Sequence, residues 1–244
     1  MSERFFSSEP VTGERAVLDG PEAHHLLHVM RTTVGESVTL FDNSGAEFTA
    51  IVEKSGRSQV ELRVIERHEI DRELPLPLIM GVALPKGDRQ KWLVEKLTEL
   101  GVTALVPLTA ERGVAQPAAA ALDRLRRAVI EACKQCGRNR LMNIAEPQIC
   151  ADWFSPRPAG WLESSDSEPP ATLRLLAHPG GTSLSKLDLT RTLPTELAIG
   201  PEGGFTDDEV ASATAAGWQP VDLGPRILRV ETAAVALAAA WTLA

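Results

Sequence analysis

This sequence of 244 residues has few cysteines and no long apolar run, and its net charge is not positive. No window approaches the ~18 consecutive apolar residues that a membrane-spanning helix needs, so a membrane protein is not expected. The first residues lack a basic segment followed by an apolar one, which argues against a secretory leader. Three cysteines, an odd number, favour free thiols in a reducing cytoplasm over a disulfide scaffold.

The net charge of -8 is distributed unevenly along the chain. Residues 1–73 carry 8 basic and 14 acidic side chains, residues 74–150 carry 11 and 7, and residues 151–244 carry 6 and 12. Binding to nucleic acid depends on Lys and Arg side chains that neutralise phosphates, so the negative net charge of the whole chain argues against a nucleic-acid partner. The local field of the basic middle third nevertheless favours an anionic one.

The proportions of 43% apolar and 24% charged residues are those of an ordinary folded protein. The length suits one large or two small domains, and we expect two. Residues 71–77 (DRELPLP) are polar and then rich in proline, which is typical of an extended boundary segment. We therefore predict a small domain over residues 1–72 and a second domain over residues 73–244.

The first domain has the pattern of short strands with one helix among them. Residues 36–41, 46–53 and 59–67 are strand-like, and Asn43 and Gly45 lie in the turn between the first two. Residues 21–31 (PEAHHLLHVMR) place apolar side chains at helical spacing after a proline suited to a first helical turn. The pattern predicts a small β-barrel or sheet with one helix packed on it.

The second domain alternates short apolar runs with helical stretches. The runs at 78–84, 104–108, 173–177 and 196–200 are typical of strands buried on both faces, and residues 89–100, 122–136, 206–216 and 231–243 have helical spacing. This alternation predicts an α/β domain with a parallel sheet and helices on both faces. Residues 155–170 are rich in Pro, Ser and Gly and are expected to form a surface excursion.

Ligands of open α/β sheets bind at the carboxyl ends of the strands, so the loop at residues 199–205 (IGPEGGF) is a first candidate site. Its glycines let a ligand approach the backbone, and Thr206 with Glu209 forms the pattern of a capping box. Asp207, Asp208 and Glu209 occupy the positive helix end that a phosphate would need. Because the glycine-rich phosphate-binding motifs are also absent, we expect a ligand without phosphate.

A second loop, residues 222–234 (DLGPRILRVETAA), combines two arginines and a glutamate. These side chains either form a ligand site or organise the surface of a loop, and the spacing alone leaves both open. Positive charge also gathers at Lys86, Arg89, Lys91, Arg124, Arg126, Arg127, Lys134, Arg138 and Arg140. This group is either the footprint of a polyanion or a solvated basic helix face.

Two other kinds of chemistry are not expected. Cys133 and Cys136 have C-x-x-C spacing, but a zinc site takes four ligands and the sequence has no second pair, so we predict no metal. The G-x-S-x-G turn of the α/β hydrolases is absent as well.

Five groups of motifs, in order, resemble the bacterial 16S ribosomal RNA (uracil-N3)-methyltransferase family of the SPOUT class. They are RFF at 4–6 with HVMR at 28–31, KGD at 86–88 with EKLTELGV at 95–102, EACKQCGR at 131–138, IGPEGGF at 199–205 and LGPRILRVETA at 223–233. The resemblance covers nearly the whole chain. Residues 142–143 and 155–170 depart from the pattern, which leaves the RNA-facing rim undefined.

The resemblance implies a fold, a cofactor and an assembly. The fold would be a PUA-like β-barrel domain that binds RNA, followed by a SPOUT α/β methyltransferase domain with a deep trefoil knot. S-adenosyl-L-methionine would lie bent in the knot, and two copies would pair through the knot region, where the helix at 233–240 has small residues. The cofactor-binding residues would be His178, Ile199, Gly200, Pro201, Glu202, Gly203, Gly204, Leu223, Gly224, Ile227, Leu228, Arg229, Thr232 and Ala233.

The resemblance also implies a reaction, the methylation of N3 of a specific uridine in 16S rRNA of the small ribosomal subunit. Arg138 and Arg229 are candidates to stabilise negative charge on the uracil oxygens. Glu202 and Glu231 are candidates to orient the base or accept its proton. The RNA phosphates would contact Arg4, Arg31, Lys86, Arg89, Arg138 and Arg140.

Three alternatives remain at this point, and one is a metabolic enzyme with a nucleotide cofactor, which the missing phosphate-binding motifs disfavour. A SPOUT methyltransferase could act on transfer RNA or on a ribose 2'-hydroxyl, because loop residues decide the target of a shared fold. A ribosome-assembly factor without catalytic activity could use the same basic face and barrel.

Overall fold

The computed structural model describes residues 3–113, 119–155, 171–187 and 192–243. The chain divides into two compact units. Unit 1 comprises Met1–Glu73 and Ile130–Leu141, and unit 2 comprises Leu74–Val129 and Met142–Ala244. The domain bounds at 1–72 and 73–244 remain a prediction, because one segment from the middle of the chain groups with unit 1.

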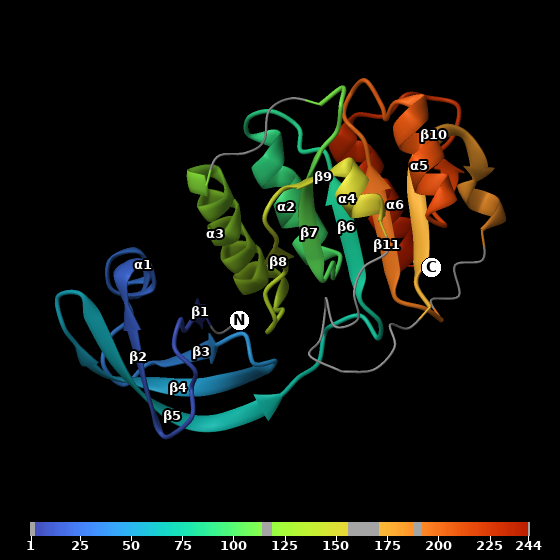
Figure 1. Ribbon diagram of the computed structural model, residues 1–244. Coiled ribbons are helices and arrows are strands. Elements are labelled where there is room, and N and C mark those ends of the chain that lie inside the picture. The colour runs from blue at the N-terminus through green and yellow to red at the C-terminus, as the bar shows by residue number, and fades with distance from the viewer. Residues whose placement is uncertain (1–2, 114–118, 156–170, 188–191, 244) are drawn as a thin grey trace. The chain divides into compact units, whose positions relative to one another are not determined.

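Unit 1 is built on a curled, mainly antiparallel sheet of five strands in the order β1-β3-β4-β5-β2 (Figure 1). The strands are β1 (Arg4–Phe6), β2 (Arg15–Asp19), β3 (Ser37–Phe41), β4 (Ala46–Ser55) and β5 (Gln59–Glu69). Only β1 pairs in parallel, with β3. In the first part of β4 every second residue is buried, because successive side chains point to opposite faces of a sheet. The predicted turn is confirmed, with Asn43 and Gly45 at φ values of 69° and 101°.

The helix predicted at residues 21–31 is present, but its second half is wound differently. The short helix α1 (Gly20–His24) carries Pro21 in its first turn and continues as the π-helix η1 (His25–Met30). Arg31 then ends the helix in the left-handed conformation, at a φ of 59°. Ala23 and Leu26 are buried in the core of unit 1. Apolar spacing locates a helix but does not distinguish α from π winding.

Unit 2 contains the predicted parallel sheet, in the order β12-β10-β11-β6-β7-β8 with β9 paired to β7 (Figure 1). Its strands are β6 (Leu78–Val82), β7 (Ala104–Thr109), β8 (Asn143–Ile144), β9 (Gln148–Ile149), β10 (Leu173–Ser183), β11 (Thr195–Ile199) and β12 (Gln219–Asp222). Every strand pairing in this unit is parallel. The central strands β6 and β11 are buried at every residue, as their apolar sequences predict.

Helices cover both faces of this sheet, with α4 and α5 in front of it and α6 behind it (Figure 1). The helices are α2 (Arg89–Glu99), α3 (Ala119–Cys136), α4 (Cys150–Phe154), α5 (Asp207–Ala215) and α6 (Val230–Thr242), with a 3-10 turn η2 (Leu184–Lys186). Helix α2 packs against α6, and α4 packs against α5. The predicted mixed α/β class is therefore confirmed.

An aromatic cluster fills the face of the sheet under α4 and α5. Trp153, Phe154 and Trp218 are fully or almost fully buried, and the Phe154 ring meets the rings of Phe205 and Trp218 edge-on at 5.5 and 5.3 Å. Gly81 of β6 lies against the Trp153 ring so closely that a Cβ atom there would be 2.6 Å from it. Large side chains therefore reach the middle of the sheet only because β6 has a glycine at this position.

Several expectations concern features beyond these elements. Among the described residues no helix is long and apolar enough to cross a membrane, and no three metal-binding side chains come together. None of the three cysteines, Cys133, Cys136 and Cys150, forms a disulfide. Apart from Ser155, the predicted surface excursion at 155–170 falls outside the described residues. The deep knot remains a prediction.

Candidate functional site

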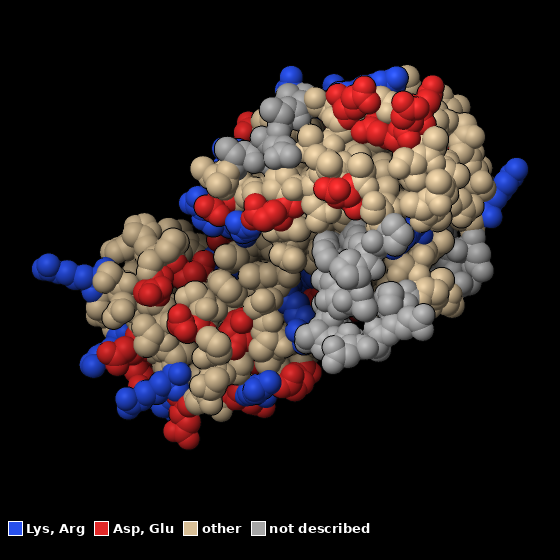
Figure 2. Space-filling view, in the orientation of Figure 1, with Lys and Arg blue, Asp and Glu red and all other residues tan. Residues whose placement is uncertain are grey.

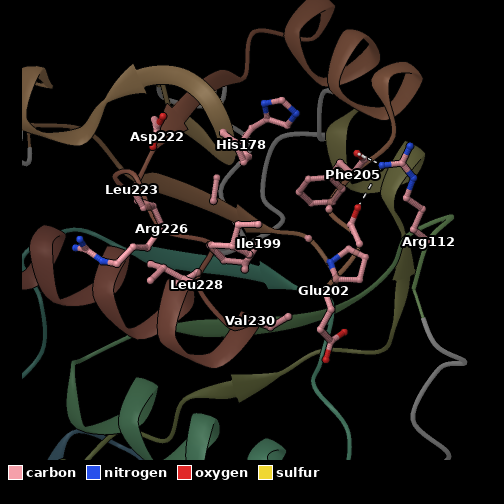
Figure 3. Close-up of a pocket in the computed structure, with 18 of the residues that line it drawn as sticks. Arg112, His178, Ile199, Glu202, Phe205, Asp222, Leu223, Arg226, Leu228 and Val230 are labelled. Atoms are coloured by element: carbon pink, nitrogen blue, oxygen red, sulfur yellow. Dashed lines mark hydrogen bonds between the residues drawn. The ribbon is translucent and has the colours of Figure 1, made fainter.

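A pocket of about 350 Å³ lies at the carboxyl ends of β10, β11 and β12 (Figure 3). One wall is the segment Ile199–Phe205, here called the pocket loop, which follows β11 directly. A second wall begins at Asp222, where β12 ends, and reaches Ala233 in α6. The third is formed by Ala177, His178 and Pro179 in β10. The pocket is at the edge where α/β sheets bind their ligands.

Twelve of the fourteen residues predicted to bind a cofactor line this pocket, whereas Arg229 and Thr232 do not. Their assignment as ligands remains a prediction. Residues that line the pocket without having been predicted are Arg112, Ala177, Pro179, Phe205, Asp207, Asp222, Arg226 and Val230. All but Arg112 lie within three positions of a predicted residue in the chain, so a wider window on each loop would have included them. The only sequence signal that could have identified Arg112 is its position shortly after the end of β7.

The glycines of the pocket loop are needed for its backbone as well as for access. Gly204 has a φ of 69°, and its N–H donates to the carbonyl of Pro201 at 2.8 Å. A Cβ atom on Gly200 would be 3.1 Å from both the ring and the backbone nitrogen of Phe205. The loop therefore folds back on itself tightly before α5 begins.

The predicted capping box at the start of α5 is confirmed. The Thr206 hydroxyl accepts from the Glu209 N–H at 3.2 Å, and the Glu209 carboxylate accepts from the Thr206 N–H at 2.8 Å. These bonds satisfy backbone donors that the helix leaves unpaired. They also fix the point at which the pocket loop enters the helix.

Asp222 ties the second wall of the pocket to the third. Its carboxylate accepts from the N–H of Gly224 at 2.7 Å and from the N–H of Gly180 at 3.1 Å. These two backbone hydrogen bonds lower the pKa of Asp222, because they stabilise the ionised form. Close by, a Cβ atom on Gly181 would be 2.5 Å from the backbone of Pro220. The two strands thus meet backbone to backbone at this corner.

Charged side chains are placed mainly around the rim of the pocket. Carboxylates are supplied by Glu202, Asp207 and Asp222. Figure 2 shows acidic side chains gathered over the N-terminal end of α5. The side chains of His178 and Arg226 point away from the pocket (Figure 3). A phosphate would meet these carboxylates unfavourably, whereas a ligand that carries positive charge would be stabilised.

The inner surface is largely apolar. It is formed by Ala177, Ile199, Leu223, Leu228 and Val230. Apolar walls with a few polar groups are typical of sites for small organic ligands, and the volume is within their usual range. The site therefore suits a small organic ligand with an apolar part and a cationic group.

The two glutamates predicted to take part in catalysis share one arginine. Arg89 of α2 is 3.3 Å from a carboxylate oxygen of Glu231 and 3.7 Å from one of Glu202. Glu231 is buried in the first turn of α6 and does not line the pocket, whereas Glu202 is on its rim. Arg89, predicted to bind RNA, is thus engaged by two carboxylates.

Arg138 and Arg4 lie in a network of charges inside unit 1. The Arg138 side chain is only 5% exposed and binds Glu73 with two guanidinium nitrogens, one of them at 3.1 Å. Arg4 donates to Glu47 at 2.6 Å, to the Asn139 side chain at 2.7 Å and to two backbone carbonyls. Neither lines the pocket. Their predicted roles in catalysis and RNA binding remain predictions.

The other residues predicted to bind RNA, Arg31, Lys86 and Arg140, are exposed. The Arg140 guanidinium lies against Gly45, where a Cβ atom would be 2.9 Å from it. These three side chains are therefore accessible, and contact with phosphate stays a prediction for them also.

Comparison with known families identifies both parts of the chain. A family model described as an RNA methyltransferase domain matches residues 72–242, and one described as an RNA methyltransferase PUA domain matches residues 18–65. The ribosomal RNA small subunit methyltransferase E of Synechocystis sp. is 35% identical over 94% of this chain and 74% of its own length. That of Bacillus subtilis is 31% identical over 88% of this chain and 85% of its own length.

Solved structures agree. The ribosomal RNA small subunit methyltransferase E of Neisseria gonorrhoeae, crystallised bound to S-adenosyl methionine, superposes with a TM-score of 0.86 at 30% identity. The match covers 98% of this chain and 96% of that one. A methyltransferase from Legionella pneumophila in complex with bound S-adenosylmethionine also gives 0.86 at 30% identity, covering 100% of this chain and 98% of that one. The chain therefore belongs to the family of ribosomal RNA small subunit methyltransferase E.

Proposed function

We propose that this protein transfers a methyl group from S-adenosylmethionine to N3 of a uridine in 16S rRNA of the small ribosomal subunit. The observation that carries this proposal is the pocket at the carboxyl ends of β10, β11 and β12, which has apolar walls and an acidic rim. Its relatives are named small subunit rRNA methyltransferases, and two of its structural neighbours were crystallised with bound S-adenosylmethionine.

The pocket suits this cofactor on physical grounds. Ile199, Leu223 and Leu228 offer an apolar surface to the adenine ring. The carboxylates of Glu202, Asp207 and Asp222 complement the positive charges of the amino group and the sulfonium. When bound, the cofactor supplies a methyl group already activated on a positively charged sulfur. The residues that line the pocket position that group, which accounts for a large part of the rate of a direct displacement.

Negative charge develops on the uracil oxygens during the reaction, and a side chain of the protein must stabilise it. Arg229 is exposed at the amino end of α6, between Leu228 and Val230, which both line the pocket. We assign it the task of stabilising negative charge on a uracil oxygen. Glu202 on the rim is better placed than the buried Glu231 to orient the base. Arg138 could share the task of Arg229 only after releasing Glu73.

Recognition of the RNA is assigned to unit 1, whose residues 18–65 match the PUA domain, and to the exposed cations Arg31, Lys86 and Arg140. We also infer that two copies pair through the region of α6, where Ala236, Ala239 and Ala240 are at least partly exposed and would allow close approach. A cytoplasmic location follows from an rRNA substrate.

Nucleoside analysis of RNA by mass spectrometry tests the proposal. Deletion of the gene should remove 3-methyluridine from 16S rRNA, and the restored gene should return it. Loss of a transfer RNA methylation or of a 2'-O-methyl group instead would assign a different target. Unchanged modification together with defective subunit assembly would favour a factor without catalysis. Purified protein supplied with free 16S rRNA or intact small subunits would then identify the form of the substrate.

A further inference from the structure

The loop that follows β7 is bound to the pocket loop. Arg112, in the segment Ala110–Gly113, donates from its Nη1 to the carbonyl of Gly203 at 3.2 Å and to that of Phe205 at 3.5 Å (Figure 3). The two chain segments also lie close together, since a Cβ atom on Gly203 would be 3.3 Å from the Cβ of Arg112. The same guanidinium therefore holds carbonyls on either side of Gly204.

Glu209 makes a second link between the same two segments. Besides its bond to the Thr206 N–H, its other carboxylate oxygen accepts from the N–H of Glu111 at 2.9 Å. The neighbouring Cys150 thiol is buried, and burial together with the negative charge of Glu209 raises its pKa to about 12. The thiol thus stays neutral beside the Glu209 carboxylate, to which it is also hydrogen-bonded.

These links act on a part of the pocket that has little other support. Gly203 and Gly204 have no side chains with which to pack, and glycine loses more conformational freedom on ordering than any other residue. Phe205 is anchored below by the Phe154 ring at 5.5 Å. The carbonyls of Gly203 and Phe205 are held by a charged donor, and such bonds are stronger than neutral ones.

We propose that Arg112 is a positioning residue for the cofactor, which acts by holding the pocket loop, with Glu209, in the shape that binds S-adenosylmethionine. The inference rests on the proposed function, because it takes that cofactor as the ligand of the pocket. Binding energy is gained when a loop is ordered before the ligand arrives, since the cost of ordering is then not subtracted from affinity. The chemistry itself needs no group from Arg112.

Two substitutions separate this role from others. Arg112→Met keeps the length of the side chain and removes its donors, and Arg112→Lys keeps one cationic donor. Because Arg112 is exposed, both variants should fold, which thermal melting checks. Arg124→Met is the matched control for cofactor binding, because Arg124 is also an exposed arginine and does not line the pocket.

For Arg112→Met we expect calorimetry to give a Kd for S-adenosylmethionine raised about tenfold, the equivalent of one charge-assisted hydrogen bond. The kcat at saturating cofactor should change less than about twofold, because only binding is affected. Arg112→Lys should recover part of the affinity, and Arg124→Met should bind S-adenosylmethionine with the Kd of the wild type. Hydrogen exchange of the cofactor-free protein should be faster at the amides of residues 203–206 in Arg112→Met alone.

The exchange measurement needs no cofactor, so it separates failure of this inference from failure of the proposed function. Unchanged exchange at residues 203–206 together with unchanged affinity would overturn the role of Arg112. Normal affinity with a large fall in kcat would overturn it too, and would make Arg112 a catalytic residue. Glu209→Gln, which loses one of its two acceptor oxygens, provides an independent check and should weaken binding in the same direction. A wild type that binds no S-adenosylmethionine would refute the proposed function instead.

Discussion

Arg138 belongs to a motif of the family, yet its side chain forms an ion pair with a residue outside that motif. The sequence places it in a basic run and the family resemblance suggests catalysis, but its guanidinium is paired with Glu73, 65 positions earlier in the chain. No local pattern reveals a partner at that separation. The same holds for Arg4, whose contacts with residues 137–139 join the two chain segments that make up unit 1.

Arg138→Met should therefore destabilise unit 1. It leaves the Glu73 carboxylate, which is 20% exposed, without its partner, and removal of one member of a buried ion pair costs about 3 kcal/mol. Glu73→Gln should lower the melting temperature similarly, and the double variant should cost less than the sum of the two. Full stability of Arg138→Met combined with loss of methylation would contradict the structural role and favour the catalytic one.

Asp222 gives a prediction on pH. Hydrogen bonds from Gly224 and Gly180 lower its pKa below the ordinary value of 3.8, so the ionised form is the one that the fold stabilises. That stability is present above the ordinary value and is lost as the pH falls through the lowered pKa. The difference in melting temperature between wild type and Asp222→Asn should be constant from about pH 5 to about pH 7 and should shrink below 3.8. A difference in melting temperature that grows on acidification would contradict the stabilising role of the ionised Asp222.

At the scale of elements, patterns that depend on neighbouring residues were predictable. The apolar runs located β6, β7 and β11, and the T-x-x-E spacing located the start of α5, because each signal arises within a few positions of the chain. Strands of two or three residues, such as β1 and β8, are too short to show a period. Strand β10 runs past its predicted end at Ala177 through an irregular stretch that contacts β12.

Gly81 in β6 tests the packing of these elements. A methyl group there would lie 2.6 Å from the rigid indole of Trp153. Gly81→Ala should therefore destabilise unit 2 by about 3 kcal/mol, at the upper end for overpacked cores. Gly13→Ala is the control, since nothing lies within 4 Å of a Cβ atom there, and chemical denaturation compares the two. Equal stability of both variants would show that the sheet yields at this position.

The organisation of the whole chain was predicted in outline only. A change of pattern near residue 72 predicts two domains, whereas the assignment of Ile130–Leu141 to unit 1 depends on contacts far apart in the sequence. The pocket was predictable because ligand sites of α/β sheets follow strand ends and because its loops contain recognisable motifs. Arg112 was missed because its partners, Gly203 and Phe205, lie more than 90 positions away.

Calorimetric titration of the full chain with two ligands that share adenosine tests the central claim most directly. The acidic rim and apolar walls predict saturable binding of S-adenosylmethionine, at one molecule per chain, and no measurable binding of ATP at equal concentration. The two ligands differ chiefly in the group attached to the ribose, which is cationic in one and a triphosphate in the other. Binding of ATP without binding of S-adenosylmethionine would contradict the account.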